Sequence, residues 1–261
     1  MPTFQSFDAQ INYQTFGAPS SPVLVFSISL GTHYGMWQEQ FDALKDQFFV
    51  ICYDTRGHGA SSTPQGPYTL QQLGEDVIRL LDHLDLAKAA FCGISMGGLT
   101  GQWLAIHYPE RFSRVIVANT AAKIGQEQAW LDRANSVREQ GLQPIAATAA
   151  SRWFTESFIQ SHPSIVSNLS NDLSAGSAMG YANCCEALAK ADVREQLKDI
   201  TIPVLVIAGT QDPVTTVADG QFMQQHIPQA RLVEINASHI SNIEQPDIFN
   251  QIVISFIQQH K

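Results

Sequence analysis

The chain has 261 residues, which fits one large α/β domain or two small ones, and either could bury a substantial core. Its composition, with 44% hydrophobic and 15% charged residues, is typical of a globular protein rather than a disordered one. The formal net charge of −9 argues against nucleic acid or an anionic membrane surface as a partner, because either would select a basic face.

Cysteine usage and the chain start bear on the cellular compartment. Cys52, Cys92, Cys184 and Cys185 form no CxxC pair and no zinc-binding spacing, so we interpret all four as reduced. The first ten residues lack a basic region followed by an apolar stretch, and no apolar run is long enough to span a membrane. We therefore expect a cytoplasmic protein without a membrane partner; no feature indicates an oligomeric state.

Short apolar runs of strand length alternate with longer helical patterns. The expected strands are Thr3–Phe7, Ile11–Phe16, Val23–Phe26, Phe48–Tyr53, Ala89–Cys92, Val115–Ala118, Val204–Ala208 and Arg231–Ile235. The first two, separated by Asp8-Ala9-Gln10, are typical of an antiparallel hairpin. The later runs are almost entirely apolar, which is typical of strands buried on both faces of a parallel sheet.

Helical spacing of apolar residues occurs between these runs. The expected helices are Tyr34–Lys45, Leu70–Leu84, Met96–His107, Thr216–His226 and Asp247–Gln259. Pro246 stands where a first-turn proline belongs, ahead of the last helix. This alternation predicts an α/β fold with a mostly parallel eight-stranded sheet and helices on both faces.

One long stretch interrupts the alternation. Residues from about 121 to 191 show helical patterns but no strand. We expect a core formed by residues 1–120 and 192–261, with a helical cap of residues 121–191 inserted after the sixth strand. Its aromatic residues either line a cavity or form the cap's own core.

The strongest chemical signal is Gly93-Ile94-Ser95-Met96-Gly97-Gly98, between an expected strand and an expected helix. A serine at such a sharp turn needs small residues two positions away on each side, because larger side chains would collide. The turn exposes the hydroxyl and directs the first N–H groups of the helix at developing negative charge. Ser95 is therefore the candidate nucleophile.

A serine hydroxyl needs a base and a carboxylate that orients it. His239 follows the last expected strand, and Asp212 lies at the tip of the strand Val204–Ala208 in Gly209-Thr210-Gln211-Asp212-Pro213. The order Ser95, Asp212, His239 is the one expected with this turn. His58, in a glycine-rich turn, is the rival base, although a structural hydrogen bond suits it better. The remaining histidines, His33, His83, His107, His162, His226 and His260, lie on helices or loops without such a setting.

Several segments carry a resemblance to a known superfamily. They are GISMGG at 93–98, DTRGHGASS at 54–62, GTQDP at 209–213 and SHISNIEQP at 238–246. Together they resemble the α/β-hydrolase superfamily over nearly the whole chain. Within it the chain is most similar to the 3-oxoadipate enol-lactonase family, on Ser29-Leu30-Gly31-Thr32 with Met36-Trp37, Asp54–Gly59 and Asn119–Gly125. That family typically has asparagine where Ile28 stands, and arginine as readily as lysine at position 123.

This resemblance implies a reaction. The chain would open the ring of 3-oxoadipate enol-lactone to 3-oxoadipate, a step of aromatic-compound catabolism, through an acyl-enzyme on Ser95. The oxyanion hole would use the N–H of Met96, the residue after the nucleophile, and the N–H of Leu30, in the loop after Val23–Phe26. Such chemistry needs neither a metal nor an organic cofactor.

The implied substrate is a small lactone that carries a carboxylate, so a basic residue should face it. The cap offers Lys123, Arg133, Arg138 and Arg152. We favour Arg133, which shares a helix face with Trp130 if that segment is helical, and we keep Lys123 as a second candidate. Trp130 and Trp153 would form apolar walls.

Other functions remain open from the residues alone. A general carboxylesterase, a carbon–carbon bond hydrolase or a cofactor-free perhydrolase would use the same three residues and differ in the cap. A ligand-binding module of receptor type on the same scaffold could also retain them, so the residues do not separate an enzyme from a receptor.

Overall fold

The computed structural model describes residues 2–259. Its strands are β1 (Thr3–Ser6), β2 (Ala9–Phe16), β3 (Val23–Ser27), β4 (Phe49–Tyr53), β5 (Ala89–Ile94), β6 (Phe112–Ala118), β7 (Val204–Gly209) and β8 (Ala230–Ile235). They form one sheet in the order β1-β2-β4-β3-β5-β6-β7-β8. Only the β1–β2 and β2–β4 pairs are antiparallel. The expected eight-stranded, mostly parallel sheet is therefore confirmed.

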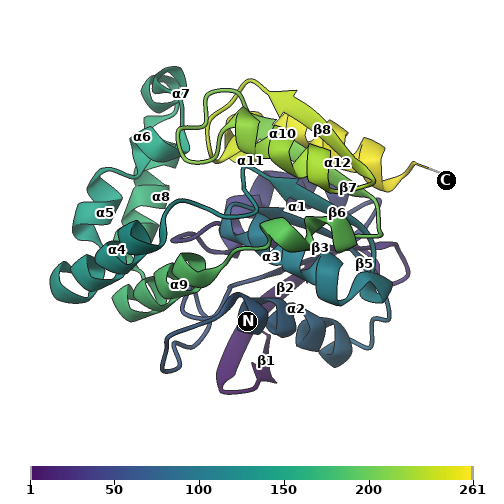
Figure 1. Ribbon diagram of the computed structural model, residues 1–261, viewed down its shortest axis with the longest axis horizontal. Helices are drawn as coiled ribbons and strands as arrows, with labels where there is room; N and C mark the ends of the chain where they lie inside the picture. The colour runs from purple at the N-terminus through teal and green to yellow at the C-terminus, as the bar shows by residue number, and fades with distance from the viewer. Residues whose placement is uncertain (1, 260–261) are drawn as a thin grey trace.

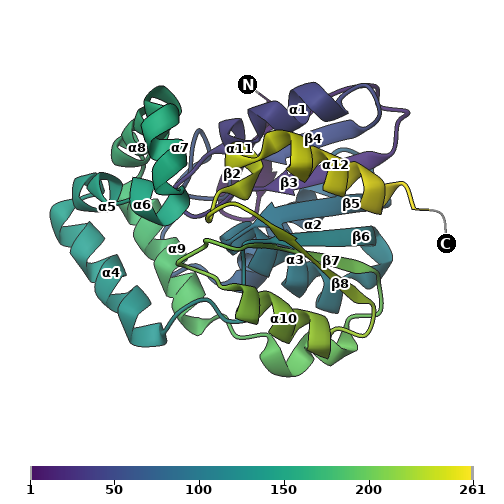
Figure 2. The same cartoon turned by 90° about the horizontal axis from the view of Figure 1, so that it is seen from above.

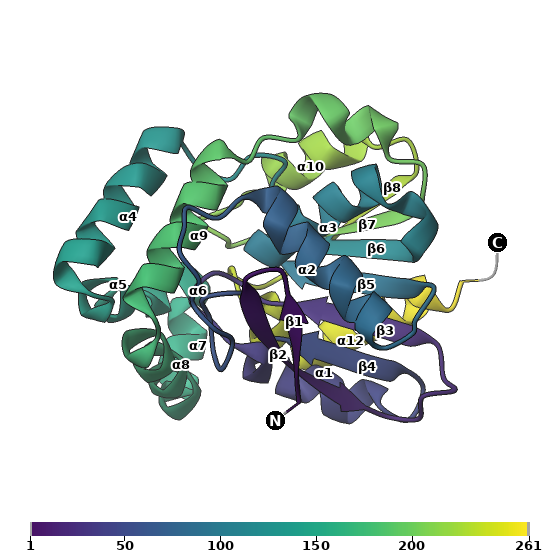
Figure 3. The same cartoon turned by 90° about the horizontal axis from the view of Figure 1, so that it is seen from below.

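Helices cover both faces of the sheet (Figures 2 and 3). The helices α1 (Gln38–Leu44), α11 (Ser241–Glu244) and α12 (Pro246–Ile257) pack together on one face. On the other face lie α2 (Leu70–His83), α3 (Met96–His107) and α10 (Val217–His226). Short 3-10 turns occupy η1 (Tyr34–Trp37), η2 (Pro109–Arg111) and η3 (Arg194–Asp199).

The expected helices correspond to these elements with small shifts at their ends. The pattern Tyr34–Lys45 is divided into η1 and α1. Thr216 lies one residue outside α10, because its side chain accepts a hydrogen bond from Asp219 N and caps the helix. Pro246 is the first residue of α12, as expected. The hairpin turn is also shorter than expected, since β2 already begins at Ala9.

Six helices connect β6 to β7, and no strand occurs between Ala118 and Val204. They are α4 (Glu127–Gln140), α5 (Gln143–Ala147), α6 (Ala150–Trp153), α7 (Glu156–Ser161), α8 (Pro163–Ala175) and α9 (Ala178–Lys190). Figures 1 and 2 show them as a group beyond one end of the sheet, with α4 packed along α9.

The central strands supply the buried core. Every residue of β4, β5 and β7 is buried, which explains why these runs are almost wholly apolar. Cys52 and Cys92 pack there as small hydrophobes, and Cys184 and Cys185 are buried on α9. All four cysteines are free. Among residues 2–259, none of the helices is long and apolar enough to cross a membrane.

Candidate active site

The turn between β5 and α3 holds Ser95 in a strained backbone conformation, with φ 56° and ψ −116°. A Cβ at Gly93 would lie 2.2 Å from the carbonyl oxygen of Gly97. A Cβ at Gly97 would lie 2.5 Å from the carbonyl oxygen of Ser27. Glycine is therefore required on both sides, and the strand–turn–helix context expected for Ser95 is present.

The carboxyl ends of β7 and β8 bring Asp212 and His239 together. The Nδ1 of His239 lies 2.8 Å from the Oδ2 of Asp212, and both side chains are almost completely buried. The loops that carry them approach each other closely at Gly209, where a Cβ would lie 2.6 Å from the carbonyl oxygen of Ala237. With Nδ1 directed at Asp212, the Nε2 of His239 is left to act on other groups.

The Asp212 carboxylate is surrounded by donors. Its Oδ1 accepts from Val214 N at 2.7 Å and Thr215 N at 3.1 Å. Burial on its own would raise the pKa of this carboxyl, but the hydrogen bond and charge of His239 and the backbone donors outweigh it, so the pKa lies below its ordinary value. Asp212 is thus ionised at neutral pH.

Asn119 is a site residue that the sequence reasoning did not identify as one. It follows β6 with φ 44°, and its Nδ2 donates to Asp212 Oδ2 and to the Ser238 carbonyl, each at 3.1 Å. Its Oδ1 accepts from the Ser241 hydroxyl at 2.6 Å. Asn119 therefore ties the Asp212 loop to the segment on both sides of His239. A polar residue at the carboxyl end of a buried parallel strand was the available signal.

Of the expected oxyanion donors, Leu30 lines the same cavity as Ser95, and Met96 follows Ser95 as the first residue of α3. Within residues 2–259, the N–H groups of Leu30 and Met96 make no hydrogen bond with the protein, so both are available to a ligand. His58 stabilises the loop after β3, because its Nε2 accepts a hydrogen bond from the Gly31 N–H at 3.0 Å. This is the structural bond expected of His58. Ile28 is fully buried, and its carbonyl oxygen accepts the Gly97 N–H at 3.1 Å.

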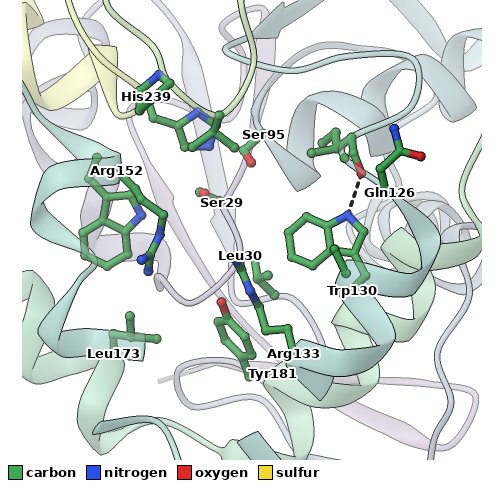
Figure 4. A pocket seen from close by; sticks show the side chains of 16 residues that line it. Ser29, Leu30, Ser95, Gln126, Trp130, Arg133, Arg152, Leu173, Tyr181 and His239 are labelled. Carbon is green, nitrogen blue, oxygen red and sulfur yellow. Dashed lines mark hydrogen bonds between the residues drawn. The ribbon is translucent and has the colours of Figure 1, made fainter. Parts of the chain in front are cut away.

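A cavity of about 270 Å³ brings these groups together (Figure 4). Ser95 and His239 face it from the core, and Trp130, Trp153 and Arg133 face it from the inserted helices. Both tryptophans are buried, and Trp130 Nε1 donates to the Ile124 carbonyl at 2.5 Å, which leaves its ring as an apolar wall. Ser29, Gln126, Arg152 and Tyr181 also line the cavity, and none of them had been chosen from the sequence.

The four basic candidates named from the sequence, Lys123, Arg133, Arg138 and Arg152, separate into two groups. Arg133 and Arg152 line the cavity. Arg138 instead forms an ion pair with Glu186 at 2.7 Å, and Lys123 lies 3.5 Å from Asp192 and is not part of the cavity wall. Arg133 and Arg152 are therefore the two of these four cations that face the cavity.

Among residues 2–259, no group of three or more His, Cys, Asp or Glu side chains is placed so that it could hold a metal ion. Of the remaining histidines, His33 pairs with Asp172 at 3.2 Å and His226 bonds the Phe222 carbonyl at 2.8 Å. His260 lies outside the described residues.

The fold and this cavity define the class of protein. Residues 22–246 match the family model of the α/β hydrolase fold, and the chain belongs to that family. It is a hydrolase, as expected from the sequence.

Particular relatives are similar over almost the whole chain. 3-Oxoadipate enol-lactonase 2 of Acinetobacter baylyi is 66% identical over 96% of this chain and 94% of its own length. 3-Oxoadipate enol-lactonase 1 of the same organism is 51% identical over 95% and 93%. The crystal structure of the enol-lactonase from Burkholderia xenovorans LB400 superposes with a TM-score of 0.97 at 42% identity, covering 99% of this chain and 100% of that one. The expected similarity to enol-lactonases is therefore confirmed.

Proposed function

We propose that this chain is a serine hydrolase that opens the ring of 3-oxoadipate enol-lactone to 3-oxoadipate in the catabolism of aromatic compounds. The observation that carries the proposal is the contact of 2.8 Å between His239 and the buried Asp212, together with the cavity that His239 and Ser95 both line. The similarity to two enol-lactonases over more than nine-tenths of the chain supports the lactone substrate. The four free, buried cysteines support a cytoplasmic location.

Catalysis begins at the lactone carbonyl. Ser95 Oγ attacks the carbonyl carbon while His239 Nε2 takes the hydroxyl proton, and Asp212 stabilises the imidazolium. The N–H groups of Leu30 and Met96 stabilise the oxyanion, each by about 3 kcal/mol in the transition state. The ring C–O bond then breaks, His239 protonates the departing enolate oxygen, and the enol becomes a ketone. Water activated by His239 finally releases the acid from Ser95.

Substrate binding involves the inserted helices, which we propose form a cap (121–191) over the core (1–120 and 192–261). Arg133 is the proposed partner of the substrate carboxylate. Its guanidinium lies 4.8 Å from the centre of the Trp130 ring, which holds it against the cavity wall. Trp130 and Trp153 supply apolar walls for the lactone ring.

The first test addresses the nucleophile. A fluorophosphonate probe is expected to label the wild-type chain and to leave Ser95→Ala unlabelled. Ser113→Ala is a matched control, since Ser113 is exposed on β6 and outside the cavity, and it should label normally. Labelling of Ser95→Ala would refute Ser95 as the nucleophile, and no labelling of the wild type would favour a receptor-like module.

The second test addresses the substrate. The kcat/KM for enol-lactone should exceed that for phenyl acetate, and bromination in acetate and peroxide should be weak. A preference for the simple aryl ester would instead indicate a general carboxylesterase. Strong bromination would indicate a perhydrolase. Retention of labelling with activity on none of these esters would point to a carbon–carbon bond hydrolase.

A further inference from the structure

Two arginines line the cavity without an acidic partner. Among residues 2–259, no carboxylate lies within 4.0 Å of the guanidinium nitrogens of Arg133 or Arg152. Arg152 donates to two neutral acceptors, the Thr148 hydroxyl at 2.6 Å and the Ile145 carbonyl at 3.1 Å. Both arginines are half-buried residues, so their charges are partly removed from water without a neighbouring carboxylate to balance them.

The two charges also act on each other. Burial, followed by the repulsion of Arg133, holds the pKa of Arg152 below its ordinary range, against the opposing effect of Tyr181. Arginine nevertheless stays protonated in proteins. Two like charges in one cavity destabilise the empty site, and a bound anion removes that cost.

Tyr181 provides a third donor. Figure 4 shows its hydroxyl directed into the cavity near the guanidinium of Arg133. Burial and the neighbouring Cys185 raise the pKa of Tyr181 to about 12, although the charges of Arg133 and Arg152 oppose this. The phenol therefore keeps its proton at neutral pH and can donate a hydrogen bond.

We propose that Arg133, Arg152 and Tyr181 form one carboxylate site opposite Ser95, and that this site, rather than a lactone ring, defines the substrate class. The chain would then also hydrolyse linear half-esters of dicarboxylic acids. This inference depends on the proposed function, because both use Ser95 as the nucleophile. In both, the acyl chain also extends from Ser95 toward the arginines.

The reaction on a half-ester is balanced without a cofactor. Ser95 Oγ bonds to the ester carbonyl carbon and its proton passes to His239. The bond to the alkoxy or phenoxy oxygen breaks, and His239 returns the proton to that leaving group. Water then attacks the acyl-enzyme, and one alcohol or phenol and one dicarboxylic acid are released per water consumed.

Chain length follows from the acyl-enzyme. Opening 3-oxoadipate enol-lactone would leave a six-carbon acyl chain on Ser95 with its carboxylate at the far end. An adipate half-ester produces an acyl chain of the same length with the same terminal charge. We therefore expect adipate to be preferred over succinate, whose acyl chain is two carbons shorter.

The experiment compares monophenyl adipate with methyl phenyl adipate, in which a methyl ester replaces the charged carboxylate. Both release phenol. The wild type should show a kcat/KM for the charged ester roughly 10- to 100-fold above that for the neutral one. This ratio corresponds to the free energy that a hydrogen bond to a charged group usually contributes. Arg133→Gln and Arg152→Gln should each reduce this ratio, the double variant should bring it close to one, and Tyr181→Phe should lower it less.

Arg138→Gln is the matched control, because Arg138 lies on the same helix as Arg133 but outside the cavity, and its ratio should equal that of the wild type. Equal rates for the two esters in the wild type would overturn this proposal, as would an unchanged ratio in Arg152→Gln. Enol-lactone hydrolysis measured on the same preparations separates the two proposals. Activity on the lactone without selectivity among phenyl esters refutes only the half-ester inference.

Discussion

At the scale of single residues, Asp212 accepts five hydrogen bonds, from Asn119, Val214, His239 and two groups of Thr215. In Asp212→Asn the amide would donate to His239 Nδ1 and hold the imidazole in the wrong tautomer. We expect kcat to fall by roughly 10⁴-fold with little change in KM. Steady-state kinetics on enol-lactone, with circular dichroism as a check on folding, measures this; a loss below about tenfold would show that Asp212 does not orient the base.

A second prediction concerns the contribution of His58 to the pH dependence of the free energy of unfolding. Burial lowers the pKa of His58 below its ordinary 6.5, although its bond to the Arg56 carbonyl opposes the shift. Below about pH 6.5 the unfolded chain therefore binds a proton that the folded chain does not, and the free energy of unfolding falls as the pH decreases. His58→Gln keeps an acceptor for the Gly31 N–H but does not titrate. Its unfolding free energy should decline less between about pH 7 and about pH 5 than that of the wild type.

Urea unfolding across this range measures the effect. His58→Ala separates the two roles, since it loses both the titration and the bond to Gly31, and it should be less stable than His58→Gln at neutral pH. Parallel pH profiles for the wild type and His58→Gln would contradict the prediction.

At the scale of elements, the backbone of the β5–α3 turn packs directly against the backbone at the end of β3. A Cβ on Gly97 would meet the carbonyl oxygens of Ser27 at 2.5 Å and Ile28 at 2.8 Å, and backbone atoms cannot move aside cheaply. Gly97→Ala should therefore lower the free energy of unfolding by about 1–3 kcal/mol. It should also lower kcat, because the displaced segment leads into the loop that carries Leu30.

Gly220→Ala is the matched control for this substitution. Gly220 lies inside α10, where alanine favours the helix, and its Cβ would lie 3.1 Å from the end of the Leu232 side chain, which can shift. The Cβ of Ala208, at 3.2 Å, is the other near neighbour, so this crowding is far milder than that at Gly97. We therefore expect a smaller loss of stability than in Gly97→Ala, of at most about 1 kcal/mol, and unaltered kinetics. Equal effects of the two substitutions in urea unfolding would show that the turn is not sterically constrained.

At the scale of the whole molecule, the sequence predicted the sheet well for a physical reason. Strands such as β5 and β7 are buried on both faces, so their sequences must be apolar and bounded by turn residues. The same logic located Ser95, Asp212 and His239, since each follows a strand at the carboxyl edge of the sheet. These features depend on local pattern and chain order, and both can be read directly.

The surroundings of several residues could not be predicted, because they depend on contacts between distant segments. Arg133 and Arg152 look alike in the sequence, and only the packing of α4, α6 and α9 brings both to the cavity. Lys123 has as its partner Asp192, which is 69 positions away along the chain. Asn119 bonds groups more than 90 positions away. No local period encodes such pairings.

The inserted helices are also joined to the histidine loop itself. Ile240 N donates to the Trp153 carbonyl at 3.0 Å, and the buried Glu244 accepts from Ser238 N at 2.9 Å and from the Thr155 hydroxyl. Thr155→Val removes that hydroxyl, which also caps α7, and should lower the free energy of unfolding by about 2–3 kcal/mol. Because Glu244 positions the residue next to His239, kcat/KM for enol-lactone should fall as well.

Thr155→Ser retains the hydroxyl and should resemble the wild type in both urea unfolding and kinetics. A loss of stability in Thr155→Val with unchanged kcat/KM would show that the inserted helices stabilise the molecule without controlling the base. A parallel loss of both, absent in Thr155→Ser, would mean that the segment forming the outer cavity wall also fixes His239. Substrate recognition and proton transfer would then depend on one shared set of contacts around Glu244.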